Sequence, residues 1–272
     1  MSSRMTIDVD GLKTSYLTAG TRGPLVLLLH GTYWSRVWLP VLDDLAAAGL
    51  RPVAVDLPGL GRSEGELTLA TAAVPALAGW VRRFAAALTD EPLAVAGHDI
   101  GGAVAQHLLA GGDGPAVRRL ALVNSVTYDS WPVPGVARYR DPAVVAATTT
   151  EELLAARRTA VTTALARPAT EPELADYLDP WRDLRVCRSW MALAGAADSR
   201  YTLGLVPALQ ADRTPKLLVW GEDDTFQEVR HAERFAAEMP ATTLVRIPGA
   251  GHIPMENDPA AVSGALAKFF LE

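Results

Sequence analysis

The segment 97–101, Gly-His-Asp-Ile-Gly, stands between two stretches of different periodicity. Before it, residues 92–96 form a short apolar run, which is typical of a strand buried on both faces. After it, apolar residues recur at helical spacing through Leu109. A buried strand that turns sharply into a helix is a unit of α/β proteins, because helices cover both faces of a parallel sheet. The segment therefore favours the α/β class.

The residue at the centre of this turn is Asp99. Glycines at 97 and 101 have no Cβ, so the strand and the helix can approach closely while the residue between them takes a strained conformation. An aspartate carboxylate is ionised at neutral pH and needs no base to act as a nucleophile. Its attack on a strained or halogenated saturated carbon gives a stable alkyl ester that water can cleave. Taken alone, the segment fits an N-capping aspartate in an ordinary βα turn equally well.

Three further loops carry polar residues directly after strand-like runs. The run 25–29 leads into His30-Gly31-Thr32, where the amides of Thr32 and Ile100 could together hold an oxyanion. The run 217–220 leads into Gly-Glu-Asp-Asp224, and the run 242–247 leads into a loop that ends at His252. The chain order is nucleophile, acid, histidine. Asp223 and Asp224 are the candidates for the acid in this order.

Composition limits the classes of partner. The chain has 272 residues and a formal net charge of −6, with no basic stripe that would favour nucleic acid or an anionic membrane. Its single cysteine, Cys187, excludes an internal disulfide. The first residues lack an apolar signal segment and no apolar run reaches membrane length, so a cytoplasmic enzyme acting on a small molecule is expected. A homodimer is compatible with the sequence, which does not decide the oligomeric state.

Strand and helix patterns alternate along most of the chain. Asp10-Gly11 predicts a hairpin at the start, followed by strands near 25–29, 52–56, 93–96, 119–123, 217–220 and 243–247. Helical patterns occupy about 38–48, 71–88, 102–110, 230–238 and 259–270. Between 128 and 211 only helical patterns occur, with capping boxes starting at Thr149 and Thr170. We expect a core of residues 1–127 and 212–272 and an inserted helical cap of residues 128–211.

The loops, the segment 56–63 and the Gly-His-Ile-Pro-Met-Glu stretch around His252 resemble the α/β-hydrolase superfamily, and more narrowly its aspartate-nucleophile branch of epoxide hydrolases and dehalogenases. The resemblance implies a mostly parallel, doubly wound sheet with a helical cap. It implies that Asp99 forms a covalent ester, and that His252, oriented by Asp224, activates water to cleave it. Asp224 is therefore the expected acid, with Asp223 as the alternative and Asp129 left open. Thr32 and Ile100 would hold the oxyanion.

The leaving group separates the subfamilies. Haloalkane dehalogenases of this branch carry side chains with N–H donors for halide at the positions of Ile100 and Thr32. Neither isoleucine nor threonine has a side-chain N–H group, so neither can bind a halide in this way. The haloacetate branch has an arginine after the nucleophile, also missing here. Epoxide hydrolases use cap tyrosines as proton donors; Tyr201 and Tyr128 are the first candidates, with Tyr139 and Tyr177 as further ones. The pocket-lining candidates are Trp34 and Trp131.

The resulting hypothesis is a cofactor-independent hydrolase that opens an epoxide to a diol through an aspartyl ester. A haloalkane or haloacid dehalogenase is the alternative. Another is a non-hydrolytic enzyme or small-molecule binder of the same fold, with Asp99 as a base. No pair of histidines has metal-ligand spacing, so no metal is expected.

Overall fold

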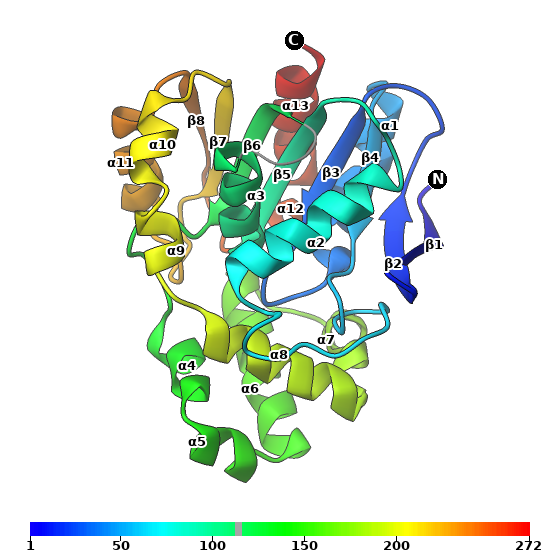
Figure 1. The fold of residues 1–272 in the computed structure, drawn as a ribbon, viewed down its shortest axis with the longest axis vertical. Coiled ribbons are helices and arrows are strands. Elements are labelled where there is room, and N and C mark those ends of the chain that lie inside the picture. Colours follow the sequence, from blue (N-terminus) through cyan, green and yellow to red (C-terminus); the bar gives the residue numbers. More distant parts are fainter. Residues whose placement is uncertain (112–115) are drawn as a thin grey trace.

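A computed structural model describes residues 1–111 and 116–272 of the chain. At its centre lies an eight-stranded sheet with the order β1-β2-β4-β3-β5-β6-β7-β8 (Figure 1). The strands are β1 Ser3–Val9, β2 Leu12–Thr18, β3 Leu25–Leu29, β4 Arg51–Val55, β5 Leu93–Asp99, β6 Val117–Ser125, β7 Lys216–Gly221 and β8 Thr242–Ile247. All neighbouring pairs are parallel except β1 with β2 and β2 with β4. The predicted α/β sheet is confirmed.

The predicted hairpin is present at the edge of the sheet. Val9 of β1 pairs with Leu12 of β2, and the two residues between them, Asp10 and Gly11, both have positive φ, 56° and 79°. Two successive positive φ values are typical of the type I′ turn, whose twist matches that of the strands it joins. The Asp-Gly pair thus sets the antiparallel edge.

Helices cover both faces of the sheet because alternate strand residues point to opposite sides. In β3, Leu27 and Leu29 join one apolar cluster, whereas Val26 and Leu28 join the other. The first cluster includes side chains of α2 (Val74–Ala86), α3 (Ile100–Ala110) and α11 (Val229–Glu238). The second includes those of α1 (Leu39–Ala47) and α13 (Pro259–Leu271), with the short η1 (Ser35–Trp38) and α12 (Pro254–Asn257) nearby. This arrangement is doubly wound.

Between β6 and β7, the fully described residues 126–215 form helices and no strand; we call this stretch the helical insertion. Its elements are α4 Pro134–Ala137, η2 Arg138–Arg140, α5 Pro142–Ala147, α6 Thr150–Leu165, α7 Glu171–Leu178, η3 Asp179–Arg182, α8 Leu184–Ala196, α9 Arg200–Leu203 and α10 Val206–Ala211. Figure 1 shows α4–α8 as a layer below the sheet, while α9 and α10 return beside α3. Both predicted capping boxes are formed. The predicted limits of a core and a cap domain stay a prediction.

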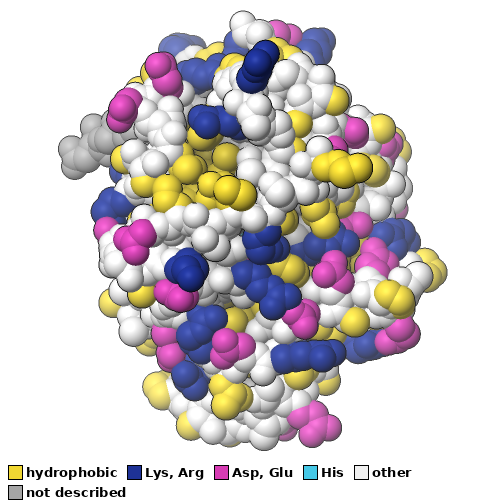
Figure 2. Space-filling view, turned by 90° about the vertical axis from the view of Figure 1, so that its right-hand side faces the viewer, with side chains coloured by type: hydrophobic (Ala, Val, Ile, Leu, Met, Phe, Trp, Pro, Cys, Tyr) yellow, Lys and Arg dark blue, Asp and Glu magenta, His cyan; other side chains and the backbone are white. Residues whose placement is uncertain are grey.

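Ion pairs cross the boundary between the helical insertion and the core. Arg188 of α8 contacts Glu66 at 2.7 Å, and Arg62 contacts Asp179. On the face shown in Figure 2, Lys and Arg side chains mix with Asp and Glu over the lower half. Exposed pairs of this kind contribute at most about 1 kcal/mol each. Partly buried contacts, among them the hydrogen bonds from Arg185 to the carbonyls of Ser63 and Gly65, add to these pairs at the boundary.

Candidate active site

Asp99 lies at the end of β5, where the chain turns into α3. Its backbone has φ 54° and ψ −131°, a conformation that costs a non-glycine residue about 1–3 kcal/mol. A Cβ on Gly97 would lie 2.5 Å from the carbonyl oxygen of Gly101, and a Cβ on Gly101 would lie 2.6 Å from that of His30. The predicted strand, sharp turn and helix are thus present, and only glycine fits on either side of the turn.

Thr32 holds one oxygen of the Asp99 carboxylate. Its N–H donates to Oδ2 at 2.8 Å and its hydroxyl donates to the same oxygen at 2.6 Å. A Cβ on Gly31 would meet the Ile100 nitrogen at 2.4 Å and Asp99 Oδ2 at 2.7 Å, so these atoms lie beside the same glycine. Ile100 opens α3, where first-turn N–H groups have no acceptor in the helix. No hydrogen bond from the described residues reaches Asp99 Oδ1.

His252 is paired with Asp224. The distance from His252 Nδ1 to Asp224 Oδ2 is 2.8 Å, and both side chains are buried. Asp223, the alternative acid, is exposed. Asp129 lies at the surface, 3.6 Å from Arg234. Of the three carboxylates that the sequence left open, Asp224 is therefore the one in contact with His252.

Further donors surround the Asp224 carboxylate. The N–H groups of Phe226 and Gln227 donate to Oδ1 at 2.7 and 3.0 Å, and Asn124 Nδ2 donates to Oδ2 at 2.8 Å. Burial acts to raise the pKa of Asp224, but the His252 charge and these hydrogen bonds hold that pKa below its usual value. For His252, burial acts to lower the pKa, yet the charge and hydrogen bond of Asp224 outweigh it, so the pKa lies above 6.5. The pair favours a charged carboxylate and a readily protonated imidazole.

Asp99 and His252 open into a cavity of about 230 Å³, a size suited to a small molecule. The helical insertion supplies the opposite wall, which includes Trp131, Tyr139 and Trp190. Both indole N–H groups are engaged: that of Trp131 donates to Thr202 Oγ1 at 2.8 Å, and that of Trp190 donates to the Thr32 carbonyl at 2.9 Å. The Tyr139 hydroxyl makes no hydrogen bond within the described ranges.

The structure does not place three of the predicted substrate-binding residues in this cavity. Tyr201 lies on α9, where its ring packs on His107 of α3. Tyr128 packs against Phe235 of α11, and the Trp34 N–H donates to the carbonyl of Tyr177 at 3.1 Å. Their assignment needs correction, because Tyr201 and Tyr128 pack on the core helices α3 and α11, and the Trp34 ring lies between Arg4, Arg62 and α7. Trp131, the fourth, does line the cavity.

Two of the residues in the cavity wall had no assigned role in the sequence. Arg157 of α6 is 4% exposed, and Tyr33 packs beside the His252 ring with centroids 6.0 Å apart. A signal for Arg157 existed: Leu153, Arg157 and Val161 are spaced by four on the buried face of α6. An arginine within an apolar helical stripe faces the interior, where charges are rare.

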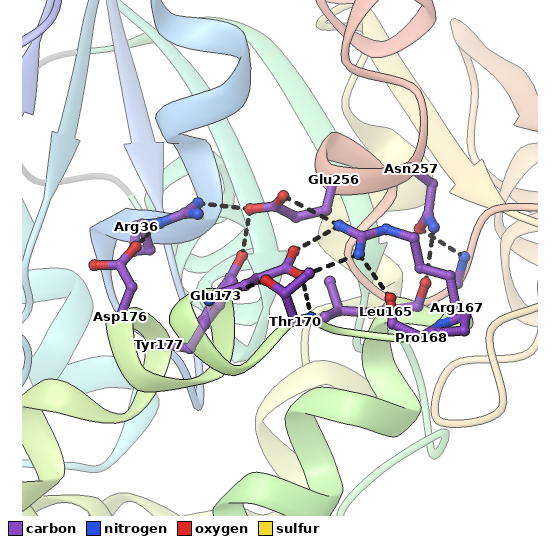
Figure 3. Close-up of polar contacts among 11 residues, drawn as sticks. Arg36, Leu165, Arg167, Pro168, Thr170, Glu173, Asp176, Tyr177, Glu256 and Asn257 are labelled. Carbon is purple, nitrogen blue, oxygen red and sulfur yellow. Dashed lines mark hydrogen bonds and ion pairs between the residues drawn. The ribbon is translucent and has the colours of Figure 1, made fainter.

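A polar network joins the helical insertion to the segment that carries His252 (Figure 3). Glu256 of α12 accepts from Arg36 at 2.6 Å and from the Tyr177 hydroxyl at 2.8 Å. The next residue, Asn257, donates to the carbonyl of Leu165 at 2.7 Å, at the end of α6. Tyr177 is thereby committed to Glu256 and is not a free proton donor. The network holds the histidine loop against the inserted helices.

Other kinds of site find no support in the described ranges, 1–111 and 116–272. Within them, no group of three or more His, Cys, Asp or Glu side chains is arranged to hold a metal ion. None of the helices there is long and apolar enough to cross a membrane.

The comparisons agree with this fold. The family model described as "Alpha/beta hydrolase family" matches residues 26–265. Uncharacterized protein Rv2715 of Mycobacterium tuberculosis is 28% identical over 280 positions, covering 96% of this chain and 79% of its own. The soluble epoxide hydrolase of Corynebacterium sp. strain C12 is 33% identical over 133 positions, covering 46% of this chain and 44% of that protein. The crystal structure of haloalkane dehalogenase DbeA from Bradyrhizobium elkani superimposes with a TM-score of 0.82 at 23% identity, covering 100% of this chain and 99% of that one. The chain belongs to the alpha/beta hydrolase family.

Proposed function

We propose that this protein opens an epoxide to a diol through a covalent ester on Asp99. The observation that carries the proposal is the state of the Asp99 carboxylate: Thr32 holds Oδ2 with two hydrogen bonds, while Oδ1 is unbonded within the described ranges. A carboxylate presented in this way to a cavity can attack a carbon of a bound substrate.

In the first step, Asp99 Oδ1 forms a bond to one ring carbon of the epoxide. The C–O bond of the ring breaks, and its electron pair moves to the ring oxygen. Tyr139 is the proposed proton donor, since this residue lines the cavity and its hydroxyl makes no hydrogen bond within the described residues. The products of this step are a hydroxyalkyl ester of Asp99 and a tyrosinate.

In the second step, His252 takes a proton from water, and the hydroxide adds to the ester carbonyl. The carbonyl oxygen is the former Oδ2, so the Thr32 and Ile100 amides would hold the oxyanion; one such donor is worth roughly 10²–10³-fold in rate. Collapse expels the alkoxide, which takes the proton from His252. Asp99 then ionises and Tyr139 regains a proton, so the net reaction is epoxide plus water to diol.

An epoxide is favoured over an alkyl halide by the donors in the cavity. A departing halide needs N–H groups directed at it; the indole N–H groups of Trp131 and Trp190 are both engaged elsewhere, which leaves the guanidinium of Arg157 as a buried N–H-bearing group of this wall. A departing alkoxide needs a proton, which a free phenol supplies. The partial similarity to a soluble epoxide hydrolase supports the same choice, while the fold shared with DbeA keeps dehalogenation as the second candidate.

A single turnover in H₂¹⁸O tests the proposal. With enzyme in excess over a small epoxide, the first diol formed should contain no ¹⁸O, because its new oxygen comes from Asp99. The label should appear in the peptide that contains Asp99. If Asp99 acted instead as a base toward water, the first diol would carry ¹⁸O, and the covalent proposal would be wrong.

The pH dependence of ester hydrolysis supplies a prediction. His252 must be neutral to accept a proton, and its pKa is raised above 6.5 because Asp224 outweighs the effect of burial. The rate should therefore fall as the pH drops, with its midpoint at the pKa of His252, which Asp224 still raises in the ester although the contribution of the Asp99 charge is then lost. In Asp224→Asn the midpoint should move to lower pH, and the maximal rate should fall by roughly 10²–10⁴-fold. The measurement is the decay of the ester in single turnovers between pH 5 and 9, and an unmoved midpoint would contradict the assignment of Asp224.

A further inference from the structure

A buried positive charge faces the same cavity as Asp99. Arg157 is 4% exposed, and it lines the cavity together with Asp99 and His252. Across the described part of the chain, no carboxylate lies within ion-pair distance of its guanidinium. Desolvating an ion costs several kcal/mol unless it gains good partners, so the other contacts of Arg157 decide what it can do.

The contacts of Arg157 within the protein are all to uncharged groups. One guanidinium nitrogen, Nη2, donates to the carbonyl of Thr32 at 3.0 Å. The guanidinium carbon lies 5.0, 5.2 and 4.7 Å from the ring centroids of Tyr33, Trp181 and Trp190. Its Nε finds no acceptor among the described residues. Its side chain also hydrogen-bonds the hydroxyl of Tyr33. Aromatic rings, one carbonyl and one phenol hold the cation in place, but none of these neutral groups neutralises it.

The charge balance of the cavity changes during the proposed reaction. Burial lowers the pKa of Arg157, and attraction to the negative charge of Asp99 works against that effect. Once Asp99 is an ester, this charge is gone. The other cation of the cavity wall, Arg138, is exposed to solvent and has Glu152 near it. Its charge is therefore not a buried charge without a counter-charge. An anion brought by the substrate would balance Arg157 throughout.

We propose that Arg157 binds a carboxylate carried by the substrate, so that the substrates are epoxy acids rather than neutral epoxides. The planar guanidinium matches a carboxylate with two parallel hydrogen bonds. It also offsets the repulsion that Asp99 exerts on an anionic substrate. This inference rests on the proposed function for its reaction, but the binding of a carboxylate can be measured without turnover.

The binding test uses the Asp99→Asn variant, which cannot form the ester. Cinnamate should bind more tightly than cinnamamide, by roughly 10- to 100-fold, as expected for a charge-assisted pair. Adding Arg157→Met should remove this preference, whereas Arg158→Met should keep it, because Arg158 is the next residue on α6 and pairs with Glu171 at the surface. Equal binding of the two probes to Asp99→Asn overturns the inference even if Arg157→Met does not fold. Bromide competing as well as cinnamate would indicate a halide site and would also overturn it.

The turnover test compares 3-phenylglycidate with its amide in the otherwise unchanged protein. The ratio of kcat/KM for acid over amide should exceed about 10 and fall to about 1 in Arg157→Met. If Arg157 only holds Thr32, both rates should fall together and the ratio should stay constant, which contradicts carboxylate binding. Turnover of both substrates at equal rates would leave the proposed function standing and remove this inference. Tight binding of cinnamate with no Asp99-dependent adduct from either epoxide would support carboxylate binding by Arg157 and remove the proposed function.

Discussion

In the His252→Gln variant, exposure to a small epoxide is expected to leave the protein heavier by the whole mass of that epoxide. The first step needs the Asp99 carboxylate and a proton donor but no histidine, so the ester should still form. The second step needs a base 2.8 Å from its orienting carboxylate, and glutamine cannot take a proton from water. Turnover should fall by at least roughly 10³-fold while the ester accumulates. Intact-mass spectrometry gives the result directly.

The Asp99→Asn variant is the control, and it should gain no mass. An alkyl halide tested in parallel would add its own mass less that of HX, so the same measurement separates the two candidate reactions. Digestion should place the added mass on the peptide that contains residue 99. An adduct that persists in Asp99→Asn, or one found on another residue, would refute the assignment of Asp99 as nucleophile.

The second large effect is expected from Gly97→Ala. The added Cβ would lie 2.5 Å from the carbonyl oxygen of Gly101 and from the Cα of Gly102, and neither backbone atom can rotate away. The strand and the helix would have to separate, so we expect a loss of roughly 3 kcal/mol or more in the free energy of unfolding. The Asp99 carboxylate would shift as well, so activity should fall even in molecules that remain folded.

Gly264→Ala is the matched control. Gly264 lies in the middle of α13, and a Cβ there would meet no heavy atom within 4 Å. Alanine is favoured over glycine in a helix by about 0.8–1 kcal/mol, so this variant should be more stable than the parent. Urea unfolding of both variants gives the two free energies. Similar midpoints for the two would show that the approach of β5 to α3 is looser than described.

Much of the arrangement around Asp99 follows from local sequence. The runs before Asp99 and Asp224 are apolar and short, and they form the buried strands β5 and β7. The run before His252 mixes polar and apolar residues and forms β8 at the edge of the sheet. Neighbouring parallel strands end at the same edge, so their loops meet there. This is why Asp224 and His252, 28 residues apart, are in contact in the structure.

The residues that the helical insertion contributes could not be placed in the same way. Tyr201, Tyr128 and Tyr139 are all tyrosines of the same region, and only Tyr139 lines the cavity. Their helices have clear start signals, but a helix can pack at several angles on a sheet. Packing on α3 and α11 decides which side chains turn inward.

By itself, the sequence determined the class of the fold, the hairpin at its edge, and the edge of the sheet at which Asp99, Asp224 and His252 meet. These features depend on strand periodicity and on glycines at fixed positions, which act over a few residues. Only the tertiary structure decided that Tyr139 and Arg157 line the same cavity as Asp99, whereas the contact of Asp224 with His252 agrees with the expected acid. Those outcomes depend on how the inserted helices and loops pack. Packing is the combined result of many weak contacts between residues far apart in the chain.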